Sequence, residues 1–330
     1  MPLQPHLVDA EVAVALVRDA TAAPSMHNAQ PWRFRFDARS STFRLYADPG
    51  RGLPYSDPAN RALVIGCGAA LFNLRVSAAH LGWHPAVHLL PDPGTPELLA
   101  TVHLADPVRP DDDLAELHPA IRSRHTSRQP FADTPIPDSV RGVLSSAADR
   151  EGATLTFPAA WHVRTLLDLV RDAERRDTTA SGAREEALRW TRTGSAADTA
   201  VDGIPEYAFG PRDREGMAPV RDFAGRQPVG RRGSATFERV PQLALLATEH
   251  DDRDDWLRAG QALERVLLAA TRHHLATALT SHALEMRDLR WITRNPDAEP
   301  RHVQMVLRLG YGPSGPDTPR RDVADVLDMD

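Results

Sequence analysis

Apolar residues at helical spacing open the chain, and an alternating apolar–polar stretch follows them. One face of a helix predicted over residues 7–22 carries Val8, Val12, Leu16 and Ala20. Residues 32–36 (WRFRF) alternate in the manner of a half-buried strand, and residues 42–46 look like a pairing partner after a short polar break. The pattern therefore predicts a helix followed by a β-hairpin.

Two longer apolar helices are predicted further on, over residues 62–81 and 256–274. Short apolar runs predict further strands at 87–90, 99–104, 154–157, 276–279 and 303–309, and amphipathic spacing predicts another helix over 163–175. Helices mixed with strands that pair locally are typical of an α+β protein.

The two long apolar helices resemble each other. Residues 68–78 align with residues 260–270 without gaps, with identical residues at Gly68/Gly260, Ala70/Ala262, Leu71/Leu263 and Ala78/Ala270. The order of elements also recurs after a polar, proline-containing stretch at 106–113. We therefore predict a duplication within one chain, with halves at residues 1–113 and 114–330.

Residues 191–233, here named the lid segment, separate elements of the second half. They are rich in Gly, Pro, Arg and Asp, with Ile204, Tyr207, Phe209 and Met217 scattered among them. A loop this long is uncommon unless it is functional or disordered. The apolar side chains favour an ordered lid, and a surface insertion without a role is the alternative.

Composition narrows the classes of function. The net charge of −6 over 330 residues gives no reason to expect nucleic acid or an anionic membrane as a partner. We expect no signal peptide and no membrane-spanning run, and hence a cytoplasmic protein. The single cysteine, Cys67, rules out an internal disulfide and a thiolate metal cluster, and we expect no metal site. All 39 basic residues are arginine, so guanidinium or backbone N–H groups must hold any bound phosphate.

Residues 24–32 (PSMHNAQPW) concentrate polar side chains between two prolines. Ser25, His27, Asn28 and Gln30 lie between the end of a predicted helix and the start of a strand. Such a turn offers converging donors and acceptors, as a heteroaromatic ring with carbonyls and ring nitrogens requires. By the residues alone, a structural turn closed by its own side chains is equally favoured.

The stretch 23–32 resembles the flavin-site motif of the nitroreductase superfamily. That family's second motif, an Arg-rich run, normally opens each subunit, whereas here a similar run occupies residues 122–131. By position, Arg124, Thr126 and Arg128 match the family residues that contact the phosphate and the flavin. Threonine replaces the usual serine, and His125 replaces an arginine, so guanidinium and hydroxyl donors are retained.

This resemblance implies a particular architecture. Nitroreductases are dimers with FMN between the subunits, and each subunit supplies one of the two motifs. Here one half carries the turn and the other half carries the Arg-rich run, which resembles a fused pseudo-dimer of the Acg-like branch with one remaining flavin site. The implied fold is α+β, with antiparallel sheets flanked by helices, and the chain would be a monomer or a homodimer.

The resemblance also assigns individual roles. It gives Pro24, Ser25, Asn28 and Gln30 to the flavin, and it makes His27 the candidate catalytic residue facing the substrate. The closing stretch, with Arg320 and Arg321, resembles the family's basic phosphate contact. The backbone at Leu279 matches the segment that passes near flavin N5 in the family.

The function implied is that of an FMN-dependent oxidoreductase. NAD(P)H would be a transient co-substrate, and a small-molecule acceptor such as a nitroaromatic or quinone would receive the electrons. A protein that stores or sequesters FMN with little turnover is the alternative. Two other interpretations are not favoured. Gly66 and Gly68 fit tight helix packing better than a dinucleotide-binding motif, and Ser25 with His27 lacks the third residue of a hydrolase triad.

Overall fold

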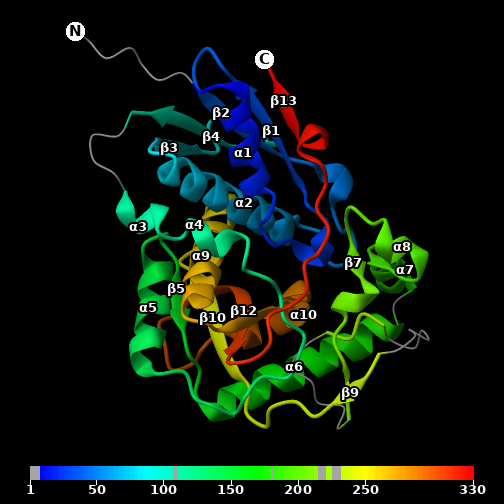
Figure 1. Cartoon of the computed structure of the whole chain (residues 1–330). Coiled ribbons are helices and arrows are strands. Elements are labelled where there is room, and N and C mark those ends of the chain that lie inside the picture. The colour runs from blue at the N-terminus through cyan, green and yellow to red at the C-terminus, as the bar shows by residue number, and fades with distance from the viewer. Residues whose placement is uncertain (1–7, 107–110, 180, 215–220, 225–231) are drawn as a thin grey trace.

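Two β-sheets, with helices packed between and around them, form the protein (Figure 1). The computed structural model describes residues 8–106, 111–179, 181–214, 221–224 and 232–330. Four residues of the predicted seam, 107–110, and lid residue Met217 lie outside the described residues. The predicted α+β class, with mainly antiparallel sheets flanked by helices, is confirmed.

The first sheet has five strands in the order β13-β1-β2-β4-β3. Its strands are β1 (Trp32–Asp37), β2 (Thr42–Ala47), β3 (His84–Leu89), β4 (Leu98–Ala105) and β13 (Leu327–Met329). β1 and β2 form the predicted hairpin, and β13 pairs parallel to β1, with Phe34 opposite Leu327. This parallel edge was not predicted, and it brings residues of the predicted second half into the first sheet.

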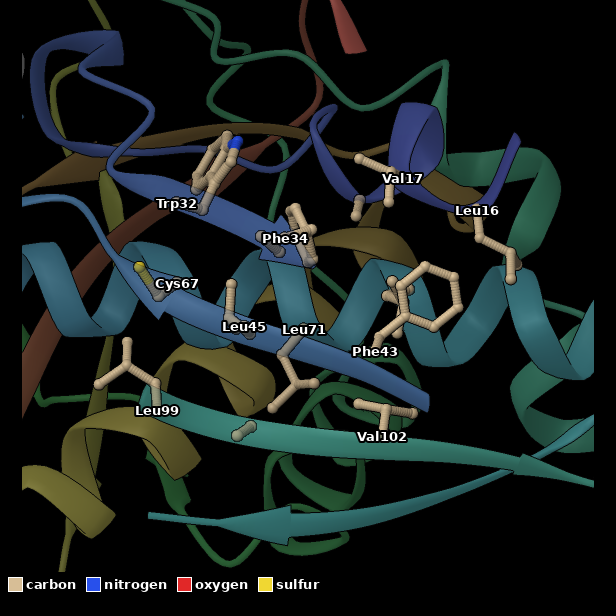
Figure 2. Close-up of a cluster of buried hydrophobic side chains, with 14 of the residues drawn as sticks. Leu16, Val17, Trp32, Phe34, Phe43, Leu45, Cys67, Leu71, Leu99 and Val102 are labelled. Carbon is tan, nitrogen blue, oxygen red and sulfur yellow. The ribbon is translucent and has the colours of Figure 1, made fainter. Parts of the chain in front are cut away.

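Alternation along β1 explains why this sheet packs on its helices. Trp32, Phe34 and Phe36 are buried, and Arg33 and Arg35 between them are exposed. The apolar face lies against α1 (Ala10–Ala20) and α2 (Arg61–His80), where Figure 2 shows Phe34, Leu45 and Leu71 meeting in one cluster. The helices predicted at 7–22 and 62–81 are thus confirmed: α1 is shorter than predicted, and α2 is shifted by one residue. Residue 7 lies outside the described residues.

The second sheet has four antiparallel strands in the order β11-β12-β10-β5. Its strands are β5 (Thr154–Thr156), β10 (Gln242–Thr248), β11 (Ala276–Thr280) and β12 (His302–Gly310). Its core joins α5 (Asp138–Asp149) and α9 (Arg253–Arg272). The sequence predicted β5, β11, β12 and α9 and missed β10 and α5.

α2 and α9 cross at two glycines in the centre of the molecule. A Cβ added to Gly260 would lie 2.8 Å from the Cα of Gly68 and closer still to the carbonyl oxygen of Ile65. A Cβ added to Gly68 would meet the carbonyl oxygen of Leu257 in the same way. Each glycine thus faces the carbonyl three residues before the other, a reciprocity that two-fold related helices produce. The duplication and its boundary at residue 113 stay predictions that this contact supports.

α2 corrects one expectation from the sequence. By length and composition this helix could cross a membrane, although no such run was expected. In the structure 89% of its apolar window is buried inside the protein, so α2 is a core helix.

The remaining elements connect the sheets and core helices or belong to the lid segment. They are α3 (Asp112–Ala115), α4 (His118–Ile121), α6 (Ala160–Thr179), α7 (Ser181–Arg189), β6 (Thr191–Arg192), α8 (Ser195–Asp198), β7 (Ile204–Pro205), β8 (Arg212–Asp213), β9 (Ser234–Ala235), α10 (His282–Glu285), α11 (Arg287–Arg290) and the single-turn helices η1 (Met26–Asn28), η2 (Pro49–Arg51), η3 (Glu206–Ala208), η4 (Trp291–Thr293) and η5 (Val323–Asp325). After β12 the chain runs back along the molecule to β13 (Figure 1).

Candidate functional site

The predicted polar turn has an unusual backbone. His27, Asn28 and Gln30 have φ angles of 52°, 53° and 52°, in the left-handed region. That region costs a non-glycine residue about 1–2 kcal/mol. The Ser25 hydroxyl accepts a hydrogen bond from the backbone N–H of Gln30 at 2.9 Å and closes the turn. Three such residues within four positions persist only where the surroundings hold them, which is common at functional sites.

Asn28 ties the turn to two distant segments. Its Nδ2 donates to the carbonyl oxygens of Gly203 at 3.0 Å and Pro319 at 2.9 Å. Its Oδ1 accepts from Nη1 of Arg320 at 3.1 Å. One side chain therefore joins the turn, the lid segment and the C-terminal segment.

Gln30 and Arg321 lie behind the turn. Gln30 is fully buried, donates from Nε2 to the carbonyl of Val201 at 2.9 Å and accepts from the backbone N–H of Arg321 at 2.9 Å. The guanidinium of Arg321 donates to the carbonyl of Asp325 at 2.8 Å. Neither side chain lines the cavity described below, and the contacts of both fix the turn from the rear.

The Arg-rich run lies along the edge of the second sheet. Thr126 forms a parallel bridge with Thr277 of β11, and the Ser127 N–H donates to the Thr277 carbonyl at 2.8 Å. Arg308 of β12 donates to Glu238 through Nε at 2.5 Å and Nη2 at 2.6 Å, and also to the carbonyl of Gln129 at 3.1 Å. This buried bidentate pair anchors the run to the sheet.

Two arginines, the buried Arg124 and the partly buried Arg320, meet near the end of α1. Arg320 donates to the carbonyl oxygens of Thr21 at 2.7 Å and Ala22 at 3.0 Å, and Arg124 donates to that of Ala22 at 2.9 Å. Cations are favoured there because the carboxyl end of a helix is partly negative. Burial, with the charge of Arg124 nearby, still lowers the pKa of Arg320 to about 9.

A buried carboxylate stands beside Arg124. Oε1 of Glu264, on α9, lies 3.3 Å from Nε of Arg124, and both side chains are buried. Burial raises the pKa of Glu264, although the charge of Arg124 opposes the shift. Glu264 was not predicted; an acid on the buried face of an apolar helix was the signal in the sequence.

Arg128 is partly buried, and no carboxylate among the described residues lies at ion-pair distance from it. Its Nη1 donates to the carbonyl of Ala208 at 2.9 Å, and its guanidinium lies 4.8 Å from the centre of the Phe223 ring. Burial, followed by the charge of Arg221, lowers the pKa of Arg128 to about 10. A buried cation in such surroundings is stabilised by an anion or by hydrogen-bond acceptors.

These segments meet around one cavity. The predicted residues that line it are Pro24, Ser25, His27, Asn28, Arg124, Thr126, Arg128, Leu279 and Arg320. Apolar walls come from both core helices and β12, through Ile65, Leu263 and Met305. A charged phosphate end and an apolar ring system would each meet matching groups here.

The lid segment supplies lining residues that the sequence did not single out. Nη1 of Arg221 lies 3.1 Å from Nε2 of His27 and 3.7 Å from Oε2 of Glu285. The Phe223 ring stands edge-on to His27 at 5.6 Å between ring centres. Both residues lie in an irregular segment, where periodicity gives no sign of which side chains turn inward.

The charge of this cavity points to an anionic ligand. Among the described lining residues are four arginines, at 124, 128, 221 and 320, and no aspartate or glutamate. The donors match an aromatic ligand carrying a phosphate, as the resemblance to nitroreductases implies.

Comparison with known proteins gives relatives that match nearly the whole chain. A Mycobacterium tuberculosis protein provisionally named NAD(P)H nitroreductase Rv3131 is 33% identical over 336 residues, which cover 98% of this chain and 93% of that protein. Another from the same organism, provisionally named NAD(P)H nitroreductase acg, is 30% identical and covers 97% and 96%. The chain belongs to this nitroreductase-like family. The resemblance predicted from the two motifs, including the Acg-like branch, is thus confirmed.

Solved structures with a likeness to this chain are more remote than these relatives. Profiles of known protein families give no match. A nitroreductase with bound FMN from Bacteroides fragilis has a TM-score of 0.37 and 14% identity, covering 62% of this chain and 93% of its own. The FMN-dependent nitroreductase NfnB from Mycobacterium smegmatis, in complex with NADPH, has a TM-score of 0.34 and 14% identity, covering 61% and 89%.

Proposed function

We propose that this protein is an FMN-dependent oxidoreductase that uses NAD(P)H to reduce a small-molecule acceptor of the nitroaromatic or quinone type. One observation carries the proposal: the Arg-rich run with Arg124 and Arg128, the C-terminal Arg320 and the polar turn lie far apart in the sequence and line one cavity. The family relatives provisionally named NAD(P)H nitroreductases support the same activity. We expect the protein to act in the cytoplasm, as a monomer or a homodimer.

The residues present fit FMN. Arg124 and Arg320 are the donors for its phosphate, since their two positive charges exceed the single carboxylate beside them. Thr126 adds a hydroxyl to the lining, and Arg128 lies deeper, among Ala208 and Phe223. A bound FMN supplies the hydride and electron chemistry, and the protein supplies binding, orientation and electrostatics.

Two side chains bear on reactivity. Arg128, a partly buried cation, would stabilise negative charge on a bound flavin. His27 is held by the turn backbone and by Arg221, and it presents its ring to the same cavity, where a substrate would meet it. His27 is therefore the proposed substrate-facing residue.

The visible spectrum of the purified protein tests the proposal. We expect a yellow protein, or a colourless one that added FMN restores. Under anaerobic conditions NADPH or NADH should bleach the flavin absorbance within seconds. A protein that takes up no FMN contradicts the proposal outright.

The lid segment favours a second candidate function, storage of FMN. Phe223 and Arg221 reach into the cavity beside His27, where a hydride donor would have to approach. A flavin that stays oxidised under NADPH would support storage.

The Phe223→Ala variant tests whether this ring limits the access of NADPH to the flavin. The substitution should speed bleaching if the ring limits access, and Tyr207→Ala, an exposed aromatic of the same lid segment, should leave the rate unchanged. Equal rates for wild type and Phe223→Ala would contradict the blocking role of this ring.

A further inference from the structure

A second hollow lies beside the cavity described above and shares a lining residue with it. Ala62, at the start of α2, lines both. Glu285 of α10 lines the second hollow, and Arg221 of the cavity lies 3.7 Å from its carboxylate. Ser281, which lines the cavity, donates to Glu285 at 2.9 Å. We name this second hollow the adjoining groove.

An exposed indole stands on the adjoining groove. Trp291, in η4, is 65% exposed, although tryptophan is among the residues that a folded protein buries most on average. An indole face open to solvent is a stacking surface for a base, and such stacking contributes about 1–3 kcal/mol per base.

A cation, Arg294, lies one turn further on along the adjoining groove. Nη2 of Arg294 donates to Nδ1 of His302 at 3.3 Å, and no carboxylate among the described residues lies within ion-pair distance of Arg294. Because a guanidinium only donates, His302 accepts here, and its other ring nitrogen carries the hydrogen. Arg294 and His302 together offer donors toward the adjoining groove.

The acids of the adjoining groove are already engaged by the protein. Asp251 accepts from Arg290 at 2.6 Å and from Trp256 at 2.7 Å. Asp57 accepts from the backbone N–H of Leu63 at 2.9 Å, and Glu285 faces Arg221 and Ser281. The other arginines of the groove, Arg61 and Arg290, donate to Gln304 at 2.6 and 2.9 Å. The pair best placed to recognise a ligand is therefore Arg294 with His302, next to the indole.

We propose that the adjoining groove binds the adenosine phosphate half of a nicotinamide dinucleotide. Trp291 stacks on the adenine, and Arg294 with His302 contacts a phosphate, either the 2′-phosphate of NADPH or the pyrophosphate common to both dinucleotides. The nicotinamide half would then extend past Ala62, which lines both hollows, into the cavity. This assignment rests on the proposed function, in which NAD(P)H delivers the hydride.

Binding of adenine nucleotides by the full chain with FMN tests the groove directly. Titration with 2′,5′-ADP or 5′-ADP should quench the tryptophan fluorescence of the wild type. The control is Trp161→Ala, which removes a different indole on α6 that is 48% exposed, and it should show the same quenching. Trp291→Ala should lose the quenching. Tighter binding of 2′,5′-ADP assigns the 2′-phosphate, and equal binding of both nucleotides assigns the pyrophosphate.

Arg294→Ala tests the phosphate contact. Loss of a charged hydrogen bond should weaken nucleotide binding and raise KM for NADPH about tenfold, with kcat and the flavin spectrum unchanged. Arg33→Ala, an exposed arginine on β1, is the matched control and should change neither quantity. A flavin spectrum like the wild type shows that each variant has folded.

The two proposals fail in different ways. If NADPH leaves the flavin oxidised while nucleotides bind in a manner that depends on Arg294, the oxidoreductase proposal is overturned and the groove stands. If NADPH reduces Arg294→Ala and Trp291→Ala with the wild-type KM, or if neither nucleotide binds, the groove assignment is overturned and the proposed function stands.

Discussion

Arginines are the residues on which the candidate site depends. The chain has no lysine, so its basic side chains in the cavity are planar guanidinium groups with a fixed set of donors. Desolvation of Arg128 and Arg320 lowers their pKa values to about 10 and about 9. An anionic ligand would offset that cost of burial, and its binding should therefore depend on these two side chains.

Arg128→Ala should weaken FMN binding. Loss of a charged hydrogen bond costs about 1.5–3 kcal/mol, and about 1.4 kcal/mol is a factor of ten in Kd. Quenching of FMN fluorescence measures the change, with Arg33→Ala as a control that keeps wild-type affinity. Unchanged affinity in Arg128→Ala would mean that the Arg-rich run is misassigned.

The lowered pKa of Arg320 also predicts a pH dependence. Its guanidinium is charged below about pH 9 and loses the charge as the pH rises through that value, so preference for a phosphate should fade in the same range. The ratio of FMN affinity to riboflavin affinity isolates this effect, because the ring is common to both ligands. We expect a constant ratio from pH 7 to 8 and a smaller one above pH 9; a ratio that is flat to pH 10 contradicts the role of Arg320.

At the scale of elements, the close crossing of α2 and α9 supports both halves of the cavity. Gly260→Ala should lower the free energy of unfolding by more than about 2 kcal/mol, because the added methyl group meets backbone that cannot move aside cheaply. Gly142→Ala is the matched control, since an added Cβ at this helical position of α5 meets nothing within 4 Å. That control should stabilise by about 0.5–1 kcal/mol through helix propensity. Thermal unfolding measures both, and equal melting temperatures would rule out a tight crossing.

The elements that the sequence predicted are those whose patterns are local. The hairpin of β1 and β2 alternates cleanly, and α2 and α9 are long and bounded by polar residues. β10, in contrast, is a run of apolar residues buried on both faces, so it shows no alternation. β13 is three residues long and is a strand only because β1 lies beside it.

At the scale of the whole molecule, the C-terminal segment connects the two sheets and completes the cavity on the way. Arg320 reaches the end of α1 and Asn28, and β13 then pairs with β1. Removal of residues 322–330 should therefore lower the melting temperature and weaken FMN binding, although none of them lines the cavity. Differential scanning calorimetry and FMN titration measure the two effects, and wild-type FMN affinity in the truncated protein would show that Arg320 holds its place alone.

The assembly of the site could not be predicted from local patterns. The polar turn on its own favoured a structural turn and a ligand site equally, and only its resemblance to a family motif joined it to Arg124 and Arg128. Arg221 and Phe223 were missed because nothing periodic marks the lid segment. Glu264 and Glu285 acquire their partners only in the folded chain.

The left-handed turn places stability and binding in conflict. Glycine at position 28 would relieve the backbone cost of a φ of 53°, yet it would delete the amide that holds Gly203, Pro319 and Arg320. Asparagine tolerates this conformation better than most residues and keeps the amide, so it is the compromise between the two demands. Selection for a more stable protein would favour glycine there, and selection for a working cavity would retain asparagine. The identity of residue 28 in divergent copies of this chain therefore reports whether the cavity is still in use.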